Sequence, residues 1–475
     1  MILQRCRPKS DVYAWRSATI ARLQCYYFIN DITGYMQHKN TGGAFRCIVA
    51  WCRGHIPDVP LVFVLAFATG LVSGGCASLL KWMIGSLGRL LTSGPDYVML
   101  ALPLAGIVIT GLVTRYVMRM DIAHGVRQLI GDLRRRDYSL RPELLYSPMA
   151  ASAITLGFGG SAGSEGPIAY TGAAVGSNLG RLFGLQPGMM KVLVGCGAAA
   201  GIAGIFKAPV GGMLFTLEVL QIGMTTMSVL ALLVSCLTSA LTAYVIEGYT
   251  IDLDFMQLSP PPAGTGWWWI VGLGVFCGLY SAYYSYVMKT VERWLSGIGR
   301  PLVRNIVAGG LLSVAVFLFP ELYGEGYQVV QRLINGCQDA VLDRTFLYGM
   351  GGPWPIVAAG AGILLIKCMA TSATNNGGGV AGDFAPTLFA GAVAGLTFSA
   401  LANAVAGAGL PVGNFALFGM AGVMAGTIHA PLMAIFLTVE MTASYPYLLP
   451  VSIVAAISFG VIRLFNFHSF YSTKI

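Results

Sequence analysis

The residue with the clearest chemical potential in this apolar chain is Glu165, which lies in the segment Gly163-Ser164-Glu165-Gly166-Pro167. A fixed carboxylate at membrane depth is costly, so its surroundings must offer a positive environment that a mobile anion can also use. When ionised, Glu165 is therefore expected to compete with such an anion for one position. The alternative is that the carboxylate only caps the helix that begins beside it, and never moves.

The composition indicates an all-α, polytopic integral membrane protein. Of the 475 residues, 56% are apolar and only 10% are charged, and the mean hydropathy is +0.70. This composition excludes a soluble enzyme with a large core. A spanning helix needs roughly 20 apolar residues. The apolar segments predicted to supply passes are 60–80, 98–117, 227–246, 267–287, 302–319, 355–371 and 448–465.

Basic segments predict the orientation and the compartment. Residues 1–55 form a basic arm without a sustained apolar core, so we expect no cleavable signal peptide and a cytoplasmic N-terminus. A second basic run, Arg134 to Arg136 with Arg141, marks another loop on that side. Such loops account for the net charge of +9, so nucleic acid is not an expected partner. Because no organelle-targeting segment or tail is present, a bacterial inner membrane is predicted.

The ten cysteines are scattered through the chain, without a paired CxxC spacing. This distribution predicts buried or cytosolic thiols and gives no support for a metal site or a disulfide framework. We therefore expect the protein to work without a metal or another cofactor.

The chain contains an internal repeat. The segment that begins at Gly197 aligns without gaps with the segment that begins at Gly419, at an offset of 222 residues, and Glu218 is then matched by Glu440. Upstream, Pro167 matches Pro386 at an offset of 219. Two matching segments in the same order indicate duplication. The predicted halves are 56–250 and 266–475, joined by a proline-rich linker at 251–265.

In each half, a glycine-rich stretch precedes a proline and then a helix of small residues. Pro167 and Pro386 fit the first turns of two helices that begin inside the membrane zone. A helix start carries unpaired N–H groups and about half a positive charge, so an anion is its natural ligand. If the two halves are inverted, both helix starts can face one point near the midplane of the bilayer.

Over residues 56–475 the chain resembles the CLC chloride channels and chloride/proton antiporters. The matches are the Glu165 segment for the gating-glutamate motif, Gly382-Asp383-Phe384-Ala385-Pro386 for the second anion-binding motif, Tyr471-Ser472-Thr473 near the end, the blocks from Lys207 to Glu218 and from His429 to Glu440, and the connecting segment Pro320 to Tyr327. The resemblance implies an inverted, duplicated fold with broken helices, a homodimer, and one anion pathway in each subunit. The paired nucleotide-binding CBS modules of many relatives are absent from this sequence.

The resemblance also implies which residues act on the anion. Glu165 is the gate. Backbone N–H groups of the two motifs, with the Tyr471 hydroxyl, replace part of the water around chloride; dipoles release an anion more readily than a buried cation does. The anion-binding residues implied in this way are Ser164, Glu165, Gly166, Asp383, Phe384, Ala385, Tyr471 and, through a departure from the pattern, His124.

His124 marks the first departure from the family pattern. The family's serine motif has the form Gly-Ser-Gly-Ile-Pro, but this chain has Ala123-His124-Gly125-Val126-Arg127. His124 replaces the serine hydroxyl either with a ring N–H or with a titratable charge, and a histidine with no pore role is the alternative.

Val219 marks the second departure, because the proton-exchanging members have a glutamate there. Valine cannot relay a proton, which favours passive conduction. A relay through water, His124 or another acid is the alternative. Glu218 and its repeat twin Glu440 are predicted to be structural, hydrogen-bonded acids.

Three further side chains have predicted positions. Asp383 would repel an anion if it faced inward, so we expect it to point away and cap the helix that begins near Pro386. Lys207 and His429 occupy matching repeat positions and are expected at helix entries near a membrane surface.

The sequence thus predicts passive transport of chloride and similar small anions through a pathway gated by Glu165. The alternatives are a chloride/proton antiporter with another internal relay and a fluoride exporter. The intact Pro167 and the retained Tyr471 favour chloride over fluoride. A membrane-embedded enzyme that uses Glu165 or His124 as an acid-base group lacks support, because no HExxH, nucleophile elbow, P-loop or intramembrane aspartate pair is present.

Overall fold

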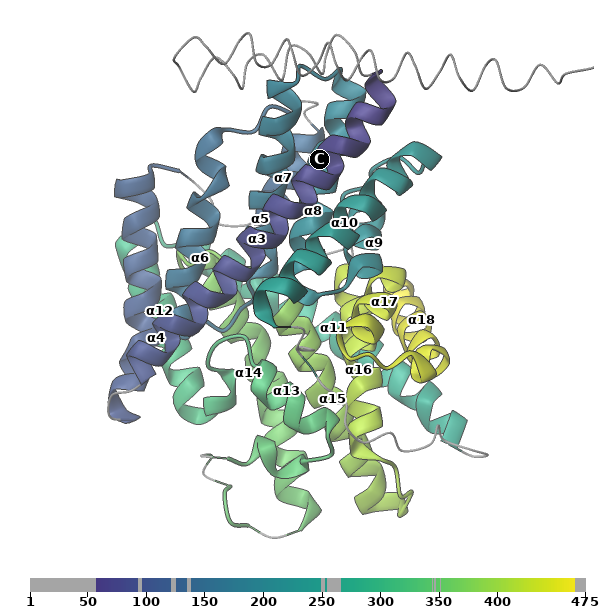
Figure 1. Cartoon of the computed structure of the whole chain (residues 1–475). Coiled ribbons are helices and arrows are strands. Elements are labelled where there is room, and N and C mark those ends of the chain that lie inside the picture. Colours follow the sequence, from purple (N-terminus) through teal and green to yellow (C-terminus); the bar gives the residue numbers. More distant parts are fainter. Residues whose placement is uncertain are drawn as a thin grey trace, which may run out of the picture. The chain divides into compact units, whose positions relative to one another are not determined.

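The computed structural model describes residues 57–92, 96–120, 125–134, 138–248, 253, 266–343, 345, 347–350 and 352–465 (Figure 1). The chain divides into two units, Met1–Leu61 and Val62–Ile475. The predicted basic arm, and the predicted linker apart from Leu253, lie outside the described residues.

The described part of the chain is helical. The helices before the linker are α3 (Asp58–Thr92), α4 (Asp96–Leu112, continued by a π-helical turn at Val113–Met118), α5 (Gly125–Arg134), α6 (Ser147–Gly157), α7 (Glu165–Leu182), α8 (Pro187–Phe206), α9 (Pro209–Glu218) and α10 (Thr226–Glu247). The helices after it are α11 (Gly266–Ser296), α12 (Pro301–Leu318), α13 (Tyr327–Ile334), α14 (Pro353–Asn376), α15 (Phe384–Ala406), α16 (Val412–Ile428), α17 (Pro431–Met441) and α18 (Leu448–Leu464).

Within these ranges, nine helices are long and apolar enough to cross a membrane. The prediction of an all-α polytopic membrane protein is therefore confirmed. Each of the seven predicted passes lies within or overlaps a helix. The sequence did not single out two further helices of spanning length, α8 and α15, whose most apolar stretches are 83% and 72% buried inside the protein.

The repeat is visible in the backbone. Lys207 is the C-cap residue of α8 and His429 that of α16, and both residues adopt left-handed conformations, with φ of 53° and 64°. A non-glycine residue rarely adopts this conformation. Helices α9 and α17 then begin at Pro209 and Pro431, so the same sharp turn between two helices occurs once in each half.

Matching glycines let the small-residue helices touch. A Cβ added to Gly172 of α7 would lie 2.0 Å from the carbonyl oxygen of Gly197 of α8, and a Cβ added to Gly391 of α15 would lie 2.3 Å from that of Gly419 of α16. No side chain fits at such distances. The duplicated glycine pattern therefore fixes the pairs α7–α8 and α15–α16, whose first members begin at the candidate site.

Candidate anion site and gate

The two glycine-rich loops that precede α7 and α15 are hydrogen-bonded to each other. Gly163 N donates to Gly382 O at 3.0 Å, and Gly382 N donates to Gly163 O at 2.6 Å, which forms an antiparallel bridge. Helices α7 and α15 therefore begin side by side, although their first residues are more than two hundred positions apart in the sequence. In Figure 1, the α7 label lies in the upper part of the view and the α15 label in the lower part.

The carboxylate of Glu165 lies on the N-terminus of α15. Glu165 is fully buried, and its Oε1 accepts hydrogen bonds from Phe384 N at 2.5 Å and from Ala385 N at 3.3 Å. These two N–H groups are among the unpaired donors of a helix start, where a negative charge is favourable. The acidic side chain from one half thus occupies the position that the helix start of the other half offers to an anion.

Only one oxygen of Glu165 is held. Among the described residues, Oε2 is buried without a hydrogen-bond partner. The carboxylate also packs against bare backbone, because a Cβ added to Gly382 would lie 2.5 Å from Glu165 Oε1 and 2.7 Å from Gly166 N. The glycine at 382 is therefore required for this contact, and few bonds must break for the side chain to leave.

Ser164 contacts a second acid, Glu325, in the connecting segment before α13. Both the backbone N of Ser164, at 2.9 Å, and its Oγ, at 2.7 Å, donate to Glu325 Oε1. In this conformation both donors of Ser164, a predicted anion-binding residue, are used by a carboxylate. The sequence analysis did not identify this partner, which lies 161 positions away.

Lys367 of α14 is the functional candidate that the sequence analysis missed. It is fully buried, its Nζ donates to Ser161 Oγ at 2.9 Å, and the Nζ lies 4.7 Å from the ring centroid of Phe389. Its ammonium also interacts electrostatically with Glu165 and Glu325. A single lysine within the apolar run 355–371 was the available signal, because a cation at that depth requires a function or a partner.

Asp383 does not form the predicted helix cap. It is the N-cap residue of α15, but its side chain makes no capping hydrogen bond. Instead, Oδ1 accepts from Asn375 Nδ2 of α14 at 2.6 Å, and the residue is 7% exposed. A nearby basic residue, Arg127 of α5, interacts electrostatically with Asp383 and forms an ion pair with Glu292 of α11 at 2.8 Å.

The two repeat acids cap each other's helices. Glu218, at the end of α9, accepts from Leu432 N and Met433 N in the first turn of α17, at 3.3 and 2.8 Å. Glu440, near the end of α17, accepts from Val210 N and Gly211 N in the first turn of α9, at 3.1 and 2.8 Å. Each carboxylate thus lies at a helix start in the other half, where it opposes the positive end of the helix dipole.

Of four other predicted residues, the structure places two, and the other two lie outside the described residues. Val219 is the half-buried C-cap residue of α9. Lys207 lies in the turn between α8 and α9, the predicted helix entry, where it is buried at 4% exposure and its Nζ forms an ion pair with Glu247 of α10 at 2.9 Å. His124 and Tyr471 lie outside the described residues, and their roles stay predictions.

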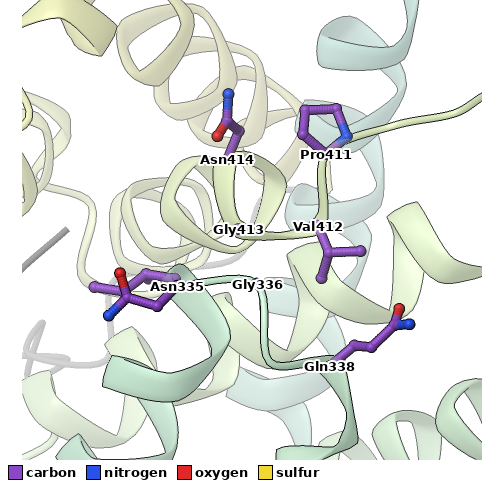
Figure 2. A pocket seen from close by; sticks show the side chains of 8 residues that line it. Asn335, Gly336, Gln338, Pro411, Val412, Gly413 and Asn414 are labelled. Carbon is purple, nitrogen blue, oxygen red and sulfur yellow. The ribbon is translucent and has the colours of Figure 1, made fainter. Parts of the chain in front are cut away.

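A separate pocket lies at the start of α16. Its volume is about 270 Å³, and its lining residues are Ile334, Asn335, Gly336, Gln338, Pro411, Val412, Gly413 and Asn414. Figure 2 shows the first turn of α16 facing the segment from Asn335 to Gln338. None of the predicted site residues lines this pocket, so it is distinct from the candidate anion site.

Comparisons with known proteins place this geometry in a family. A family model described as "Voltage gated chloride channel" matches residues 105–463. The "Putative chloride channel protein ClcB-like" of Ralstonia nicotianae is 31% identical over 396 residues, which are 79% of this chain and 86% of the relative. The "H(+)/Cl(-) exchange transporter ClcA" of Citrobacter koseri is 26% identical over 412 residues, 82% of each chain.

Solved structures show the same fold. A slow cyanobacterial Cl-/H+ antiporter superposes with a TM-score of 0.72 at 21% identity, over 86% of this chain and 96% of the other. The likeness at this level of identity concerns the fold, and it extends over almost the whole of the compared structure.

Proposed function

Since the chain belongs to the voltage-gated chloride channel family (CLC), we propose that its chloride pathway is gated by Glu165 and is closed in the conformation described above. The observation that supports this proposal is the position of Glu165 Oε1 on the amides of Phe384 and Ala385. A chloride ion requires the same donors. Carboxylate and anion therefore exclude each other, and protonation of the carboxylate weakens its hold on the amides.

The surroundings of the gate fit a site that binds weakly enough to conduct. The two amides provide partial charges, which replace water without holding the anion as an ionic partner would. Lys367 contributes a positive charge when it is protonated, but its Nζ is bonded to Ser161 and lies over the ring of Phe389. We propose that Lys367 raises the anion affinity of the site from this position as a background charge.

Passive conduction is the mode that the sequence favours. The position at which exchanging members carry an internal glutamate is Val219, whose side chain has no group that takes up a proton. Proton-coupled exchange is the second candidate, and it is supported by the exchange transporter among the relatives. Such exchange requires another acid that carries the proton between Glu165 and the cytoplasmic water.

The gate is tested by chloride efflux from liposomes at a series of pH values. Wild-type efflux is expected to rise as the pH falls, because protonation removes the charge with which Glu165 competes. Glu165→Gln is expected to give high efflux at every pH. Glu143→Gln, at an exposed acid between α5 and α6, is the matched control and keeps the wild-type profile. A Glu165→Gln protein that retains the wild-type pH dependence would contradict the gate assignment.

The transport mode is tested with a chloride gradient and no proton gradient across the same liposomes. Passive conduction predicts chloride flux with no change in internal pH. Uphill proton movement that depends on the chloride gradient would establish exchange instead.

The same proposal includes a homodimer with one pathway per subunit, a cytoplasmic N-terminus and a bacterial inner membrane. The family supports the dimer, and the basic segments of the sequence support the orientation. Cross-linking of the reconstituted protein and protease protection of residues 1–55 test these points separately.

A further inference from the structure

Two polar clusters adjoin Glu165. The first, the Lys367 cluster, consists of Ser161, Ser164, Glu325 and Lys367. The second, the Asp383 cluster, consists of Arg127, Glu292, Asn375 and Asp383. Both clusters include a residue of α14, and Lys367 and Asn375 are separated by about 12 Å along that helix. The clusters therefore lie at different levels along α14.

Asp383 is a buried acid attached directly to the donors of the anion site. Its neighbour Phe384 supplies the shorter amide hydrogen bond to Glu165, and the two carboxylates interact electrostatically. Among the described residues, Asp383 has one hydrogen-bond donor, Asn375, and no ion-pair partner. Two buried carboxylates this close oppose each other's ionisation, so a proton on one changes the proton affinity of the other.

The charged and titratable groups around Asp383 come from several elements. Glu165 of α7, Arg127 of α5 and Glu292 and Tyr284 of α11 all interact electrostatically with Asp383. The cation is itself paired, since Arg127 Nη1 donates to Glu292 Oε1 at 2.8 Å. The side chains of that pair are 17% and 30% exposed. The Asp383 cluster therefore runs from the buried gate to partly exposed groups.

We propose that Asp383 is a second protonation site of the gate, which lets Glu165 respond to pH on the side where Arg127 and Glu292 lie. This inference rests on the proposed function. When Asp383 is ionised, its negative charge favours the protonated form of Glu165, so the Glu165 carboxylate releases the amides of Phe384 and Ala385 at a higher pH. When Asp383 takes up a proton from water, Glu165 keeps its charge, and its hold on the amides, down to a lower pH. The proton then returns to the same water, so no other reactant is required.

The direction of the effect follows from the charges. The negative charge of Asp383 makes protonation of Glu165 easier, so its removal means that Glu165 takes up its proton only at lower pH. Asp383→Asn is therefore expected to shift the midpoint of pH-activated chloride efflux to lower pH by about 1 pH unit, as expected for the loss of one nearby buried charge. The titration is also expected to become steeper, because a proton on Asp383 no longer lowers the proton affinity of Glu165.

Two further variants keep the proposal testable if Asp383→Asn folds poorly. Arg127→Gln removes the cation near Asp383, so its activation midpoint is expected to move to higher pH. Asp383→Glu keeps a carboxylate at the same backbone position and is expected to keep the broad wild-type titration. Asp339→Asn, at an exposed acid of the turn after α13, is the matched control.

The deciding measurement is chloride efflux from liposomes that contain the whole protein, between pH 4 and pH 8. Opposite shifts in Asp383→Asn and Arg127→Gln support the proposal. Wild-type midpoints in both variants, or a shift of the Asp383→Asn midpoint to higher pH, would overturn it. The proposed function would still stand in that case, provided that the wild-type protein shows pH-activated chloride efflux. Failure of the proposed function is a separate result, namely no chloride efflux in the wild-type protein or wild-type pH dependence in Glu165→Gln.

Discussion

Glu218 and Glu440 each cap a helix in the other half of the chain, and their replacement is expected to lower the stability of the protein. The pH dependence of the proposed gate is expected to stay unchanged. Glu218 and Glu440 each accept two backbone N–H groups, at the starts of α17 and α9 respectively. Alanine at either position leaves two helix-start donors without their partner. The carboxylates lie on a different pair of helices from Glu165, so the pH dependence of chloride efflux is expected to stay that of the wild type.

The size of the loss follows from the contacts. Loss of a side-chain cap at a helix start costs about 0.5–2 kcal/mol. Leu432 N lies at an exposed position, whereas both donors to Glu440 are partly buried. We therefore expect a loss of about 2 kcal/mol for Glu218→Ala and about 3 kcal/mol for Glu440→Ala. The corresponding glutamine variants keep one acceptor oxygen and should lose roughly half as much.

The assay is unfolding of the purified protein in mixed micelles with increasing denaturing detergent, followed by chloride efflux from liposomes. The double variant is expected to lose less than the sum of the single losses, because both caps hold the same pair of helices. The reasoning would be refuted if either alanine variant kept wild-type stability while its efflux acquired a new pH dependence. That outcome would make the repeat acids part of the transport mechanism.

Three further perturbations follow from the same structure. Lys367→Met is expected to lower the apparent chloride affinity on the order of tenfold, because a buried positive charge is lost. Lys367→Arg is the control. An unchanged dependence of efflux on chloride concentration would contradict this role. Burial raises the pKa of Glu321, between α12 and α13, to about 7. The folded state therefore binds the proton more tightly than the unfolded state. Its stabilising contribution is complete below the ordinary pKa of about 4.5 and is lost as the pH rises through about 7. The melting temperature should therefore be higher at pH 5 than at pH 8, and Glu321→Gln should reduce the difference. Gly382→Ala places a methyl group 2.7 Å from Gly166 N, so it is expected to cost about 1–3 kcal/mol of stability and to impair efflux, and wild-type behaviour in both assays would contradict the bridge geometry.

The sequence predicted the fold class because composition and repeated motifs carry that information directly. The apolar runs located seven of the passes, and prolines at 167 and 386 marked the helices that begin in the interior. It did not single out α8 and α15 as passes, because their stretches are rich in glycine and alanine and are buried by neighbouring helices. Hydropathy measures the length of an apolar stretch, but it does not show which helices bury that stretch.

The candidate site was predictable only where neighbouring residues determine it. The segment around Glu165 and the segment around Phe384 were both identified, and the structure brings them together through the Gly163–Gly382 bridge. The contacts between Ser164 and Glu325, and between Ser161 and Lys367, join positions 161 and 206 residues apart. No local pattern encodes such pairs, so the charged residues can be read from the sequence but the residues that they contact cannot.

Asp383 shows how a local rule fails near a functional site. An aspartate directly before a helix start is typically a cap, and the sequence analysis therefore directed its side chain to the helix amides. In the structure the Glu165 carboxylate, which comes from the other half of the chain, accepts from two of those amides, and the Asp383 side chain accepts from Asn375 instead. Competition between two acids for one helix start decided the outcome.

The central claim is that Glu165 and a halide compete for the N–H groups of Phe384 and Ala385. Its most direct test is the anomalous diffraction of crystals of the Glu165→Gln protein grown in bromide, compared with wild-type crystals grown in the same salt. A bromide peak within hydrogen-bonding distance of both amides in the variant, and a carboxylate there in the wild type, is the predicted result. Bromide absent from these amides in the variant, or bound to them in the wild type while the Glu165 carboxylate also occupies them, would contradict the account.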